Sequence, residues 1–256
     1  MSEPPLPTPH ELAQLDVKAV LRDATRKQGF VTPMFEHIAP RYDAFTRLFS
    51  FGMDTGWKAT LVSWMHEQSP PPARIVDLAC GTGDLAIAAS RAFPNATVTG
   101  LDAAQRMVGE ATERLRDGSL PNVHFVVGDL TATGLESSSV DAVFAGYGFR
   151  NIPRLDDGLA EVARVLRPGG RLYVLDFYKP RARWWRALFL GYLRVSGSVV
   201  GWWWHRAPVM YAYIADSIDA WVDARAFEDA LARHGLRVER RREVLMGGVA
   251  MHAARR

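Results

Sequence analysis

A glycine turn followed by a distant aspartate is the part of the sequence best suited to chemistry. The apolar run at 75–80 breaks at Gly81-Thr82-Gly83, and Asp102 ends the next apolar run, nineteen positions after Gly83. Glycines supply backbone torsions that a Cβ forbids, and they let a ligand approach the backbone. A carboxylate at the place of Asp102 accepts hydrogen bonds from ribose hydroxyls. The spacing therefore predicts a site for a ligand that carries a ribose.

The same loop argues against a dinucleotide. It reads GTGD and lacks the third glycine that brings helix and strand together around a pyrophosphate. Asp84 stands at the start of the following helix, where the positive end of the helix dipole otherwise attracts a phosphate. A cationic ligand with a ribose fits these features better, and S-adenosylmethionine is such a ligand.

The elements that must position this loop alternate between strand and helix patterns. Apolar runs predict strands at 74–79, 97–101, 123–127, 140–146 and 171–177, with two more near 236–243 and 247–253. Apolar periodicity predicts helices at 83–93, 104–116, 155–166 and 224–234. The alternation predicts an α/β fold whose largely parallel sheet is covered by helices on both faces.

The region before the sheet has a different composition. Residues 1–9 carry four prolines and predict a disordered tail, and residues 11–26 have the apolar spacing of one amphipathic helix. The aromatic-rich segment 30–65 ends in a helix expected from Thr55, with Thr55 or Asp54 as its cap. We therefore divide the chain into a tail and helix at 1–29, a helical cap at 30–69 and a catalytic domain at 70–256.

An insertion at 181–217 is unusually rich in aromatic residues. Its tryptophans are Trp184, Trp185, Trp202, Trp203 and Trp204. Arg194 and three glycines interrupt its apolar run, which argues against a membrane-spanning helix. We expect a lid over an apolar substrate pocket. Tryptophan and arginine also suit a membrane surface, so the sequence leaves peripheral membrane contact open.

Composition narrows the classes of function. The formal net charge is +3 and the basic clusters, at 181–183 and 237–242, are short, which is typical of solvated element ends and not of a nucleic-acid-binding stripe. The single cysteine, Cys80, excludes an internal disulfide framework and fits a reducing compartment. The N-terminus lacks a signal pattern, so we expect a cytoplasmic protein. The seven histidines show no metal-ligand spacing, and no metal is expected.

Six ordered segments resemble the S-adenosylmethionine-dependent C-methyltransferases of menaquinone and ubiquinone biosynthesis. They are FEHIAPRYDAFTRLFSFGMDTGWK at 35–58, VDLACGTGDLA at 76–86, GYGFRNIP at 146–153, RVLRPGGRLYVLDFYKP at 164–180, YAYIADSI at 211–218 and GGVAMH at 247–252. The third looks like a Gly-hydrophobic-Arg-Asn signature specific to this family. The resemblance implies a class I methyltransferase fold with a Rossmann-like mixed seven-stranded sheet. It also implies that a methyl group moves from S-adenosylmethionine to a ring carbon of a reduced prenylated quinone.

The resemblance also assigns residues to roles. The methionine portion of the cofactor is expected at Thr82 and its glycines, the ribose at Asp102 and the adenine at Asp129 and Leu130. Arg150 and Asn151 occupy the place of the family's catalytic pair. The full expected cofactor site is Tyr42, Asp77, Gly81, Thr82, Gly83, Asp102, Met107, Asp129, Leu130 and Gly146. The expected catalytic residues are Asp43, Arg150 and Asn151.

The implied reaction assigns a task to the catalytic residues. A ring carbon becomes nucleophilic when a ring hydroxyl is at least partly ionised, and the pKa of a phenol is about 10. The guanidinium of Arg150 would favour the phenolate, and Asn151 can donate to the same oxygen. Arg150 is no general base because its own pKa exceeds about 12. Water held by Arg150, or a carboxylate such as Asp43, is therefore the expected proton acceptor.

Departures from the family pattern keep other substrates open. Thr46 stands where asparagine is usual, Asp176 where glutamate is common, and Gly146 where relatives can carry serine. The alternative is a methyltransferase that acts on another lipophilic phenol, a sterol or a polyketide. A nucleic-acid methyltransferase is disfavoured because the tryptophans lie in an apolar run. Intact Asp102 and Arg150 disfavour a non-catalytic cofactor-binding partner, and the sequence leaves homodimerisation open.

Overall fold

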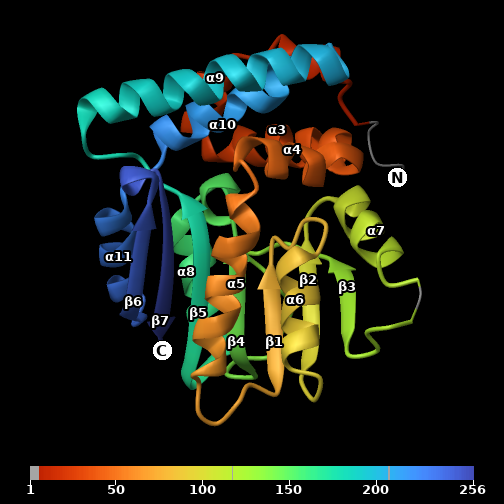
Figure 1. Ribbon diagram of the computed structural model, residues 1–256, viewed down its shortest axis with the longest axis vertical. Helices are drawn as coiled ribbons and strands as arrows, with labels where there is room; N and C mark the ends of the chain where they lie inside the picture. Colours follow the sequence, from red (N-terminus) through yellow and green to blue (C-terminus); the bar gives the residue numbers. More distant parts are fainter. Residues whose placement is uncertain (1–5, 117, 207) are drawn as a thin grey trace.

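Three short helices open the chain. The computed structural model describes residues 6–116, 118–206 and 208–256 (Figure 1), so residues 1–5 of the expected tail lie outside the described residues. The helices are α1 (Pro9–Ala13), α2 (Val17–Arg22) and α3 (Ala24–Ile38). The prediction of one helix at 11–26 is wrong. Asp16 and Asp23 each accept a backbone N–H, from Ala19 at 3.2 Å and Thr25 at 3.0 Å, and each starts a new helix.

The centre of the molecule is a seven-stranded sheet in the order β3-β2-β1-β4-β5-β7-β6. The strands are β1 (Arg74–Leu78), β2 (Thr97–Asp102), β3 (Val123–Val127), β4 (Val140–Gly146), β5 (Leu166–Phe177), β6 (Arg237–Val244) and β7 (Val249–Arg255). β7 runs antiparallel to β5 and β6, and the other neighbouring strands are parallel. The predicted mixed sheet is confirmed. The strand order reverses between β1 and β4, where open α/β sheets bind ligands beyond the carboxyl ends of their strands.

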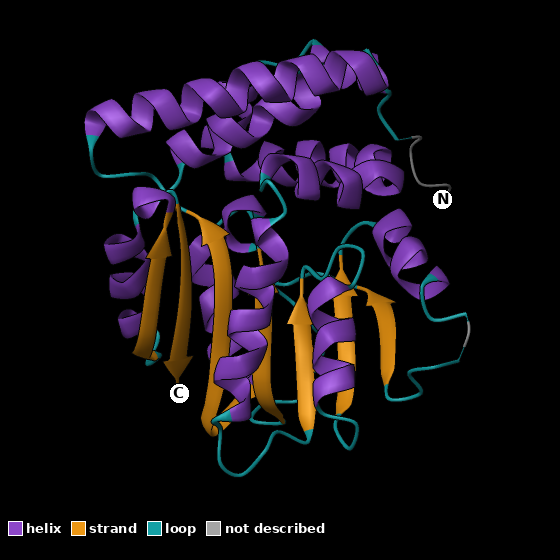
Figure 2. Ribbon diagram, in the orientation of Figure 1, coloured by secondary structure: helices purple, strands orange, loops and turns teal. Residues whose placement is uncertain are grey.

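Helices cover both faces of the sheet (Figures 1 and 2). One face carries α5 (Met53–His66) and α6 (Asp84–Ala92), and the other carries α8 (Leu155–Val165) and α11 (Ala224–Arg233). α7 (Gln105–Glu113) packs beside β2 and β3. The expected cap of α5 is wrong. The helix begins after Gly52, which has φ +75°, and Asp54 is a buried residue of its first turn.

A helical roof lies above the carboxyl ends of the parallel strands (Figure 2). It consists of α3, the turn η1 (Ala39–Arg41), α4 (Tyr42–Phe49), α9 (Arg183–His205) and α10 (Val209–Ala220). α9 and α10 pair closely because Gly197 has no side chain: a Cβ there would lie 2.8 Å from the backbone of Tyr211. Buried aromatic residues, among them Phe30, Tyr211 and Tyr213, fill the roof. Among the described residues, no helix is both long enough and apolar enough to cross a membrane.

Candidate active site

Two cavities meet beneath the roof, at the carboxyl ends of the central strands. The first holds about 630 Å³ of open space and the second about 600 Å³, counting the parts open to solvent. Both are lined by Phe35, Tyr42 and Tyr147, so these three aromatic side chains form the wall between them. A third, smaller space of about 330 Å³ continues from Tyr42 and Tyr147 along the glycine loop.

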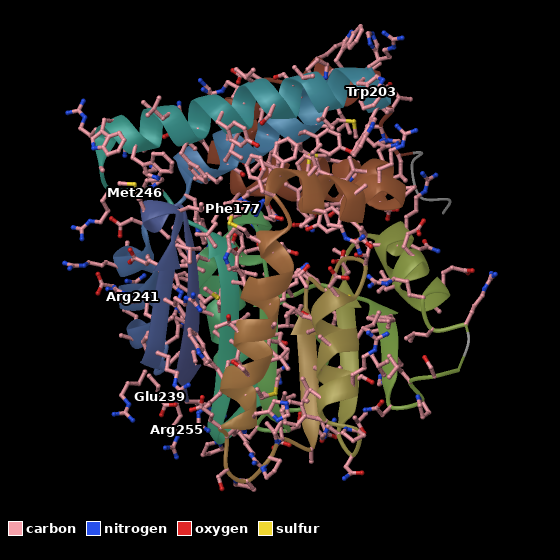
Figure 3. All side chains as sticks on the ribbon, viewed as in Figure 1. Phe177, Trp203, Glu239, Arg241, Met246 and Arg255 are labelled. Carbon is pink, nitrogen blue, oxygen red and sulfur yellow. The ribbon has the colours of Figure 1, made fainter. Side chains whose placement is uncertain are left out.

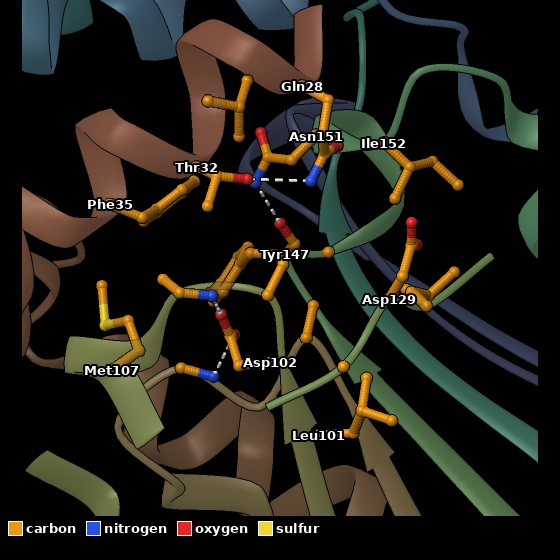
Figure 4. A pocket seen from close by; sticks show the side chains of 18 of the residues that line it. Gln28, Thr32, Phe35, Leu101, Asp102, Met107, Asp129, Tyr147, Asn151 and Ile152 are labelled. Carbon is orange, nitrogen blue, oxygen red and sulfur yellow. Dashed lines mark hydrogen bonds between the residues drawn. The ribbon is translucent and has the colours of Figure 1, made fainter. Parts of the chain in front are cut away.

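The first cavity lies at the crevice where the strand order reverses (Figure 4). Asp102, at the end of β2, lies on its wall, and its carboxylate accepts the N–H of Gly81 at 2.8 Å and of Ala104 at 2.9 Å. Burial raises the pKa of Asp102 above its usual value. The other predicted cofactor residues on this cavity are Tyr42, Gly81, Met107, Asp129, Leu130 and Gly146. The structure thus gathers most of the predicted set around one space.

The glycines near the first cavity meet two different structural requirements, a positive φ and a close neighbour. Gly81 and Gly83 have φ of +55° and +85°, which are torsions that favour glycine. Gly83 lines none of the three spaces, because it packs against β3: a Cβ there would lie 2.5 Å from the Phe125 ring. At Gly146 a Cβ would come within 2.8 Å of Leu85 on α6. Gly83 therefore supports the loop from behind and does not face the cavities.

The third space has charged groups of both signs. Asp77 is buried; its Oδ2 accepts the N–H of Ala86 at 2.9 Å, while its Oδ1 has no hydrogen-bond partner among the described residues. Burial raises the pKa of Asp77 to about 8. Lys58 Nζ lies 2.6 Å from Asp54 and 2.8 Å from Asp84. An amino-acid ligand fits here, because its ammonium can donate to the free Asp77 oxygen and its carboxylate can approach Lys58.

Asp43 contacts Thr82 of the glycine loop and neither Arg150 nor Asn151, the predicted catalytic pair. Thr82 donates its hydroxyl to Asp43 Oδ1 at 2.5 Å, and Arg114 lies 3.5 Å from Asp43 Oδ2. This contact fastens α4 over the loop. Asp43 lines none of the three spaces, and the carboxylate beside the Arg150 side chain is that of Asp176. The prediction that Asp43 accepts a proton beside Arg150 is therefore corrected.

Arg150 is buried in the turn η2 (Phe149–Asn151), directly after β4. Its NH1 donates to the carbonyl of Tyr147 at 3.1 Å and to Asp176 at 3.4 Å, and its guanidinium lies 5.3 Å from the centre of the Phe177 ring. Its Nε–H has no partner among the described residues. Asp176 is fully buried, and burial raises its pKa to about 6. Hydrogen bonds thus fix the NH1 group of the Arg150 guanidinium, whereas its Nε–H donor is unpaired within the described residues.

Lys27 supports this turn from α3. Its Nζ donates to the Arg150 carbonyl at 2.7 Å. Burial, with Arg150 nearby, lowers the pKa of Lys27 to about 8. The contact ties the roof to the loop after β4, and nothing in the spacing of the sequence links two residues so far apart.

The predicted catalytic pair does not line one cavity. Arg150 lines the second cavity and Asn151 the first, where its Nδ2 donates to the Tyr147 carbonyl at 2.9 Å (Figure 4). The hydroxyl of Tyr213 donates to Asn151 Oδ1 at 2.8 Å. Both polar ends of the Asn151 amide are therefore engaged by the protein. The expectation that Arg150 and Asn151 contact the same substrate oxygen is not the arrangement found.

Tyr147 has a larger part in the site than its sequence indicates, because a tyrosine in this position predicts only a pocket wall and not a catalytic group. It lines all three spaces, its carbonyl accepts from both Arg150 and Asn151, and its hydroxyl donates to Asp54 at 2.7 Å. Its φ is +60°, which is strained for a residue with a Cβ. Strain of this kind is typical of functional sites. Its place between two glycines, Gly146 and Gly148, is the one signal in the sequence.

The second cavity is almost entirely apolar. Side chains of α3, α4, α9 and α10 line it, and they include Met34, Ile38, Phe45, Phe49, Leu193 and Met210. Arg150 is the charged residue among its lining, and Thr46 and Ser50 add hydroxyls. Such a space suits a lipophilic molecule with one polar end placed at Arg150.

Comparisons with known proteins agree with this geometry. Residues 21–256 match the ubiE/COQ5 methyltransferase family. A demethylmenaquinone methyltransferase of Thermus thermophilus is 38% identical over 227 residues, covering 85% of this chain and 96% of that protein. A ubiquinone/menaquinone biosynthesis C-methyltransferase of Cereibacter sphaeroides is 30% identical over 241 residues, covering 89% and 90%.

Solved structures confirm the predicted fold class. A SAM dependent methyltransferase from Aquifex aeolicus has a TM-score of 0.60 at 18% identity, covering 86% of this chain and 97% of that one. Geranyl diphosphate C-methyltransferase from Streptomyces coelicolor has a TM-score of 0.58 at 15% identity, covering 78% and 79%. The mixed seven-stranded sheet with helices on both faces is thus the class I methyltransferase fold.

Proposed function

The chain belongs to the ubiE/COQ5 methyltransferase family, and from this premise we propose that it methylates a ring carbon of a reduced prenylated quinone. It is an S-adenosylmethionine-dependent methyltransferase. The observation that carries the substrate proposal is the second cavity, whose lining is mostly apolar and has Arg150 as its charged residue. Demethylmenaquinol and the reduced ubiquinone precursor both have this form, a polar ring with a prenyl tail.

The residues of the first and third spaces fit the cofactor. When bound, S-adenosylmethionine supplies a methyl group on a positively charged sulfur. We assign the ribose to Asp102 and the adenine to the wall at Met107, Asp129 and Leu130. We assign the cofactor's ammonium to the unpartnered oxygen of Asp77, and its carboxylate to Lys58, the cation in the lining of the third space.

On the substrate side, Arg150 stabilises the reactive form of the ring. A fixed guanidinium in an apolar cavity lowers the pKa of a bound phenol, because the phenolate gains an opposite charge and a charge-assisted hydrogen bond. The free Nε–H of Arg150 is the donor for the ring oxygen. Asp176 acts as a positioning residue, since its carboxylate accepts hydrogen bonds from the guanidinium and from the backbone N–H of Arg150.

The wall between the cavities controls the transfer itself. The new carbon–carbon bond forms as the carbon–sulfur bond breaks, and the ring carbon then loses its proton to water held by Arg150. Cation and anion neutralise each other in this step, so a dry and closely aligned site favours it. Asn151, bonded to Tyr147 and Tyr213, holds the wall in place.

The test is a methyl-transfer assay with labelled S-adenosylmethionine. Reduced demethylmenaquinone and the reduced ubiquinone precursor are offered separately, each dispersed in detergent. Turnover of either supports the proposal and identifies the ring. An absence of turnover on both, with cofactor binding intact by calorimetry, would contradict it and favour another lipophilic phenol, a sterol or a polyketide.

A prenylated quinol as substrate also bears on the location of the protein in the cell. Such a substrate resides in the bilayer, so we propose that the protein contacts the inner face of the membrane peripherally while remaining a cytoplasmic protein.

A further inference from the structure

α9 displays one continuous row of exposed apolar side chains. The row includes Trp184, Leu188, Tyr192, Val195, Val199 and Trp203, whose exposed fractions run from 42 to 73%. Steps of three and four residues place them on one face of a helix. The opposite face, with Phe189, Leu193 and Val200, is buried against the rest of the roof. The fold therefore uses one side of α9 and leaves the other apolar side in solvent.

The exposed surface continues beyond the helix. Phe51, in the turn between α4 and α5, is 73% exposed, has φ +50° and stacks on Tyr192 with ring centres 5.9 Å apart. Met246 lies exposed near the first turns of α9, where Trp185 donates to the Leu245 carbonyl at 2.8 Å; Trp203 stands near the opposite end of α9 (Figure 3). A row of this length is more than isolated apolar residues on a soluble surface, and it marks an interaction site.

The charged residues of α9 and of its two ends are all basic. α9 contains no aspartate or glutamate, and exposed arginines flank it: Arg181 and Arg183 at its start and Arg206 just after its end. Arg181 lies 3.9 Å from Asp223, whereas no acidic partner is found for Arg183 or Arg206 among the described residues. Arg206 lies 4.7 Å from the centre of the Trp202 ring. Within the row, Arg194 is paired with Asp216 at 2.8 Å. Basic ends, tryptophans near both ends and an apolar centre are the features of a helix that lies in the interface of an anionic membrane.

We infer that α9 docks along the surface of an anionic lipid bilayer, with its exposed row inserted at the boundary between headgroups and acyl chains. The position of the row on the molecule supports a lipid bilayer as its partner. Leu193 and Phe49 line the second cavity, while their near neighbours Tyr192 and Phe51 are exposed and stacked together. The docked surface thus borders the apolar cavity. That consequence rests on the proposed function, whereas the binding to lipid does not.

A second copy of the chain fits the row less well. A two-fold contact between two α9 helices packed in opposite directions would set Arg181 and Arg183 of one copy beside Arg206 of the other. α9 has no acidic residue to pair with them. Headgroup phosphates offer the missing negative charge at both ends of the helix.

The experiment is vesicle flotation of the full chain. The vesicles are phosphatidylcholine alone or phosphatidylcholine mixed with phosphatidylglycerol, and the test variant is Val195→Glu/Val199→Glu. Val126→Glu/Val127→Glu is the matched control, because Val126 and Val127 are exposed valines of the edge strand β3 and the pair adds the same two charges outside the roof. We expect the wild type and Val126→Glu/Val127→Glu to float with the anionic vesicles. The double variant should lose about tenfold or more in its partition coefficient, because two inserted side chains become charged.

Two results would overturn the inference. One is equal flotation of the double variant and the wild type. The other is a wild type that does not float with anionic vesicles; a dimer that the double variant dissociates would then assign the row to a second copy. Circular dichroism of both variants checks that they fold. If the chain floats with vesicles but methylates no quinol in detergent, the proposed function fails and the docking surface stands.

Discussion

The two cavities that meet at Tyr147 differ in the elements that complete them. The first lies between α3 and the strand ends with their loops, where Asp102 is fixed by two backbone N–H groups. The second lies between two helix pairs that are distant in sequence, α3 with α4 and α9 with α10, and has Arg150 as its charged residue. The first cavity, with Asp102 and Asp129 in its wall, can bind a charged cofactor by hydrogen bonds, and the second cavity can strengthen one electrostatic contact to a substrate. Substitutions in the first cavity should therefore mainly change cofactor binding, and substitutions in the second should mainly change turnover.

Removal of Arg150 should have the largest effect. Arg150→Ala should lower turnover by about a hundredfold or more, because the phenolate loses its cation, while cofactor affinity stays within about threefold. Initial rates with labelled cofactor and calorimetry with S-adenosylhomocysteine measure the two quantities. Arg154→Ala is the control, since Arg154 is an exposed arginine that pairs with Asp157. A collapse of cofactor affinity in Arg150→Ala would mean that Arg150 belongs to the first cavity.

Loss of the Asp176 charge should have a smaller and pH-dependent effect. The raised pKa of Asp176, about 6, means that the carboxylate beside Arg150 is ionised at neutral pH and becomes protonated as pH falls through 6. Wild-type turnover should therefore decline below about pH 6. Asp176→Asn should lower turnover by about tenfold at neutral pH and should lack that decline. An unchanged acidic limb in the variant would exclude Asp176 as its origin.

Cofactor binding should release protons. The raised pKa of Asp77, about 8, keeps this carboxyl largely protonated at pH 7 without ligand, and an ammonium beside it favours the ionised form. Titration calorimetry in two buffers of different ionisation enthalpy should show proton release at pH 7 that fades as the pH rises above 8. Asp77→Asn should bind more weakly and release none. Identical binding heats in both buffers for the wild type would contradict this assignment.

The smallest effect should come from the wall between the cavities. Tyr213→Phe removes the hydrogen bond to Asn151 and should lower turnover by about fivefold, the cost of one neutral hydrogen bond, with little change in cofactor affinity. The double variant Tyr213→Phe/Asn151→Ala measures the coupling. If the two substitutions act additively, Tyr213 does not work through Asn151.

The same contrast explains what sequence could predict. The strands at 74–78 and 97–102, the turn at Gly81 and the place of Asp102 all follow from local patterns, since a parallel sheet brings its strand ends to one edge. The second cavity depends on contacts such as Lys27 to Arg150 and Tyr213 to Asn151, which join residues with no periodic relation. The strained φ of Tyr147 and the assignment of Asp43 to Thr82 are tertiary facts of the same kind.

The exposed row of α9 could be predicted from the sequence only in part. Its apolar content was evident from the sequence, but which side faces solvent depends on Gly197 and the close packing of α10. The lid was therefore predictable as an element, and its outer surface was not.

The most direct measurement is the position of the transferred methyl group. Wild-type protein is given S-adenosylmethionine with an isotope-labelled methyl group and reduced demethylmenaquinone, and the product is analysed by nuclear magnetic resonance. We predict a label bonded to a ring carbon, because Arg150 holds the ring oxygen and leaves the carbon as the nucleophile. A label on the ring oxygen would contradict the proposed arrangement of the two cavities.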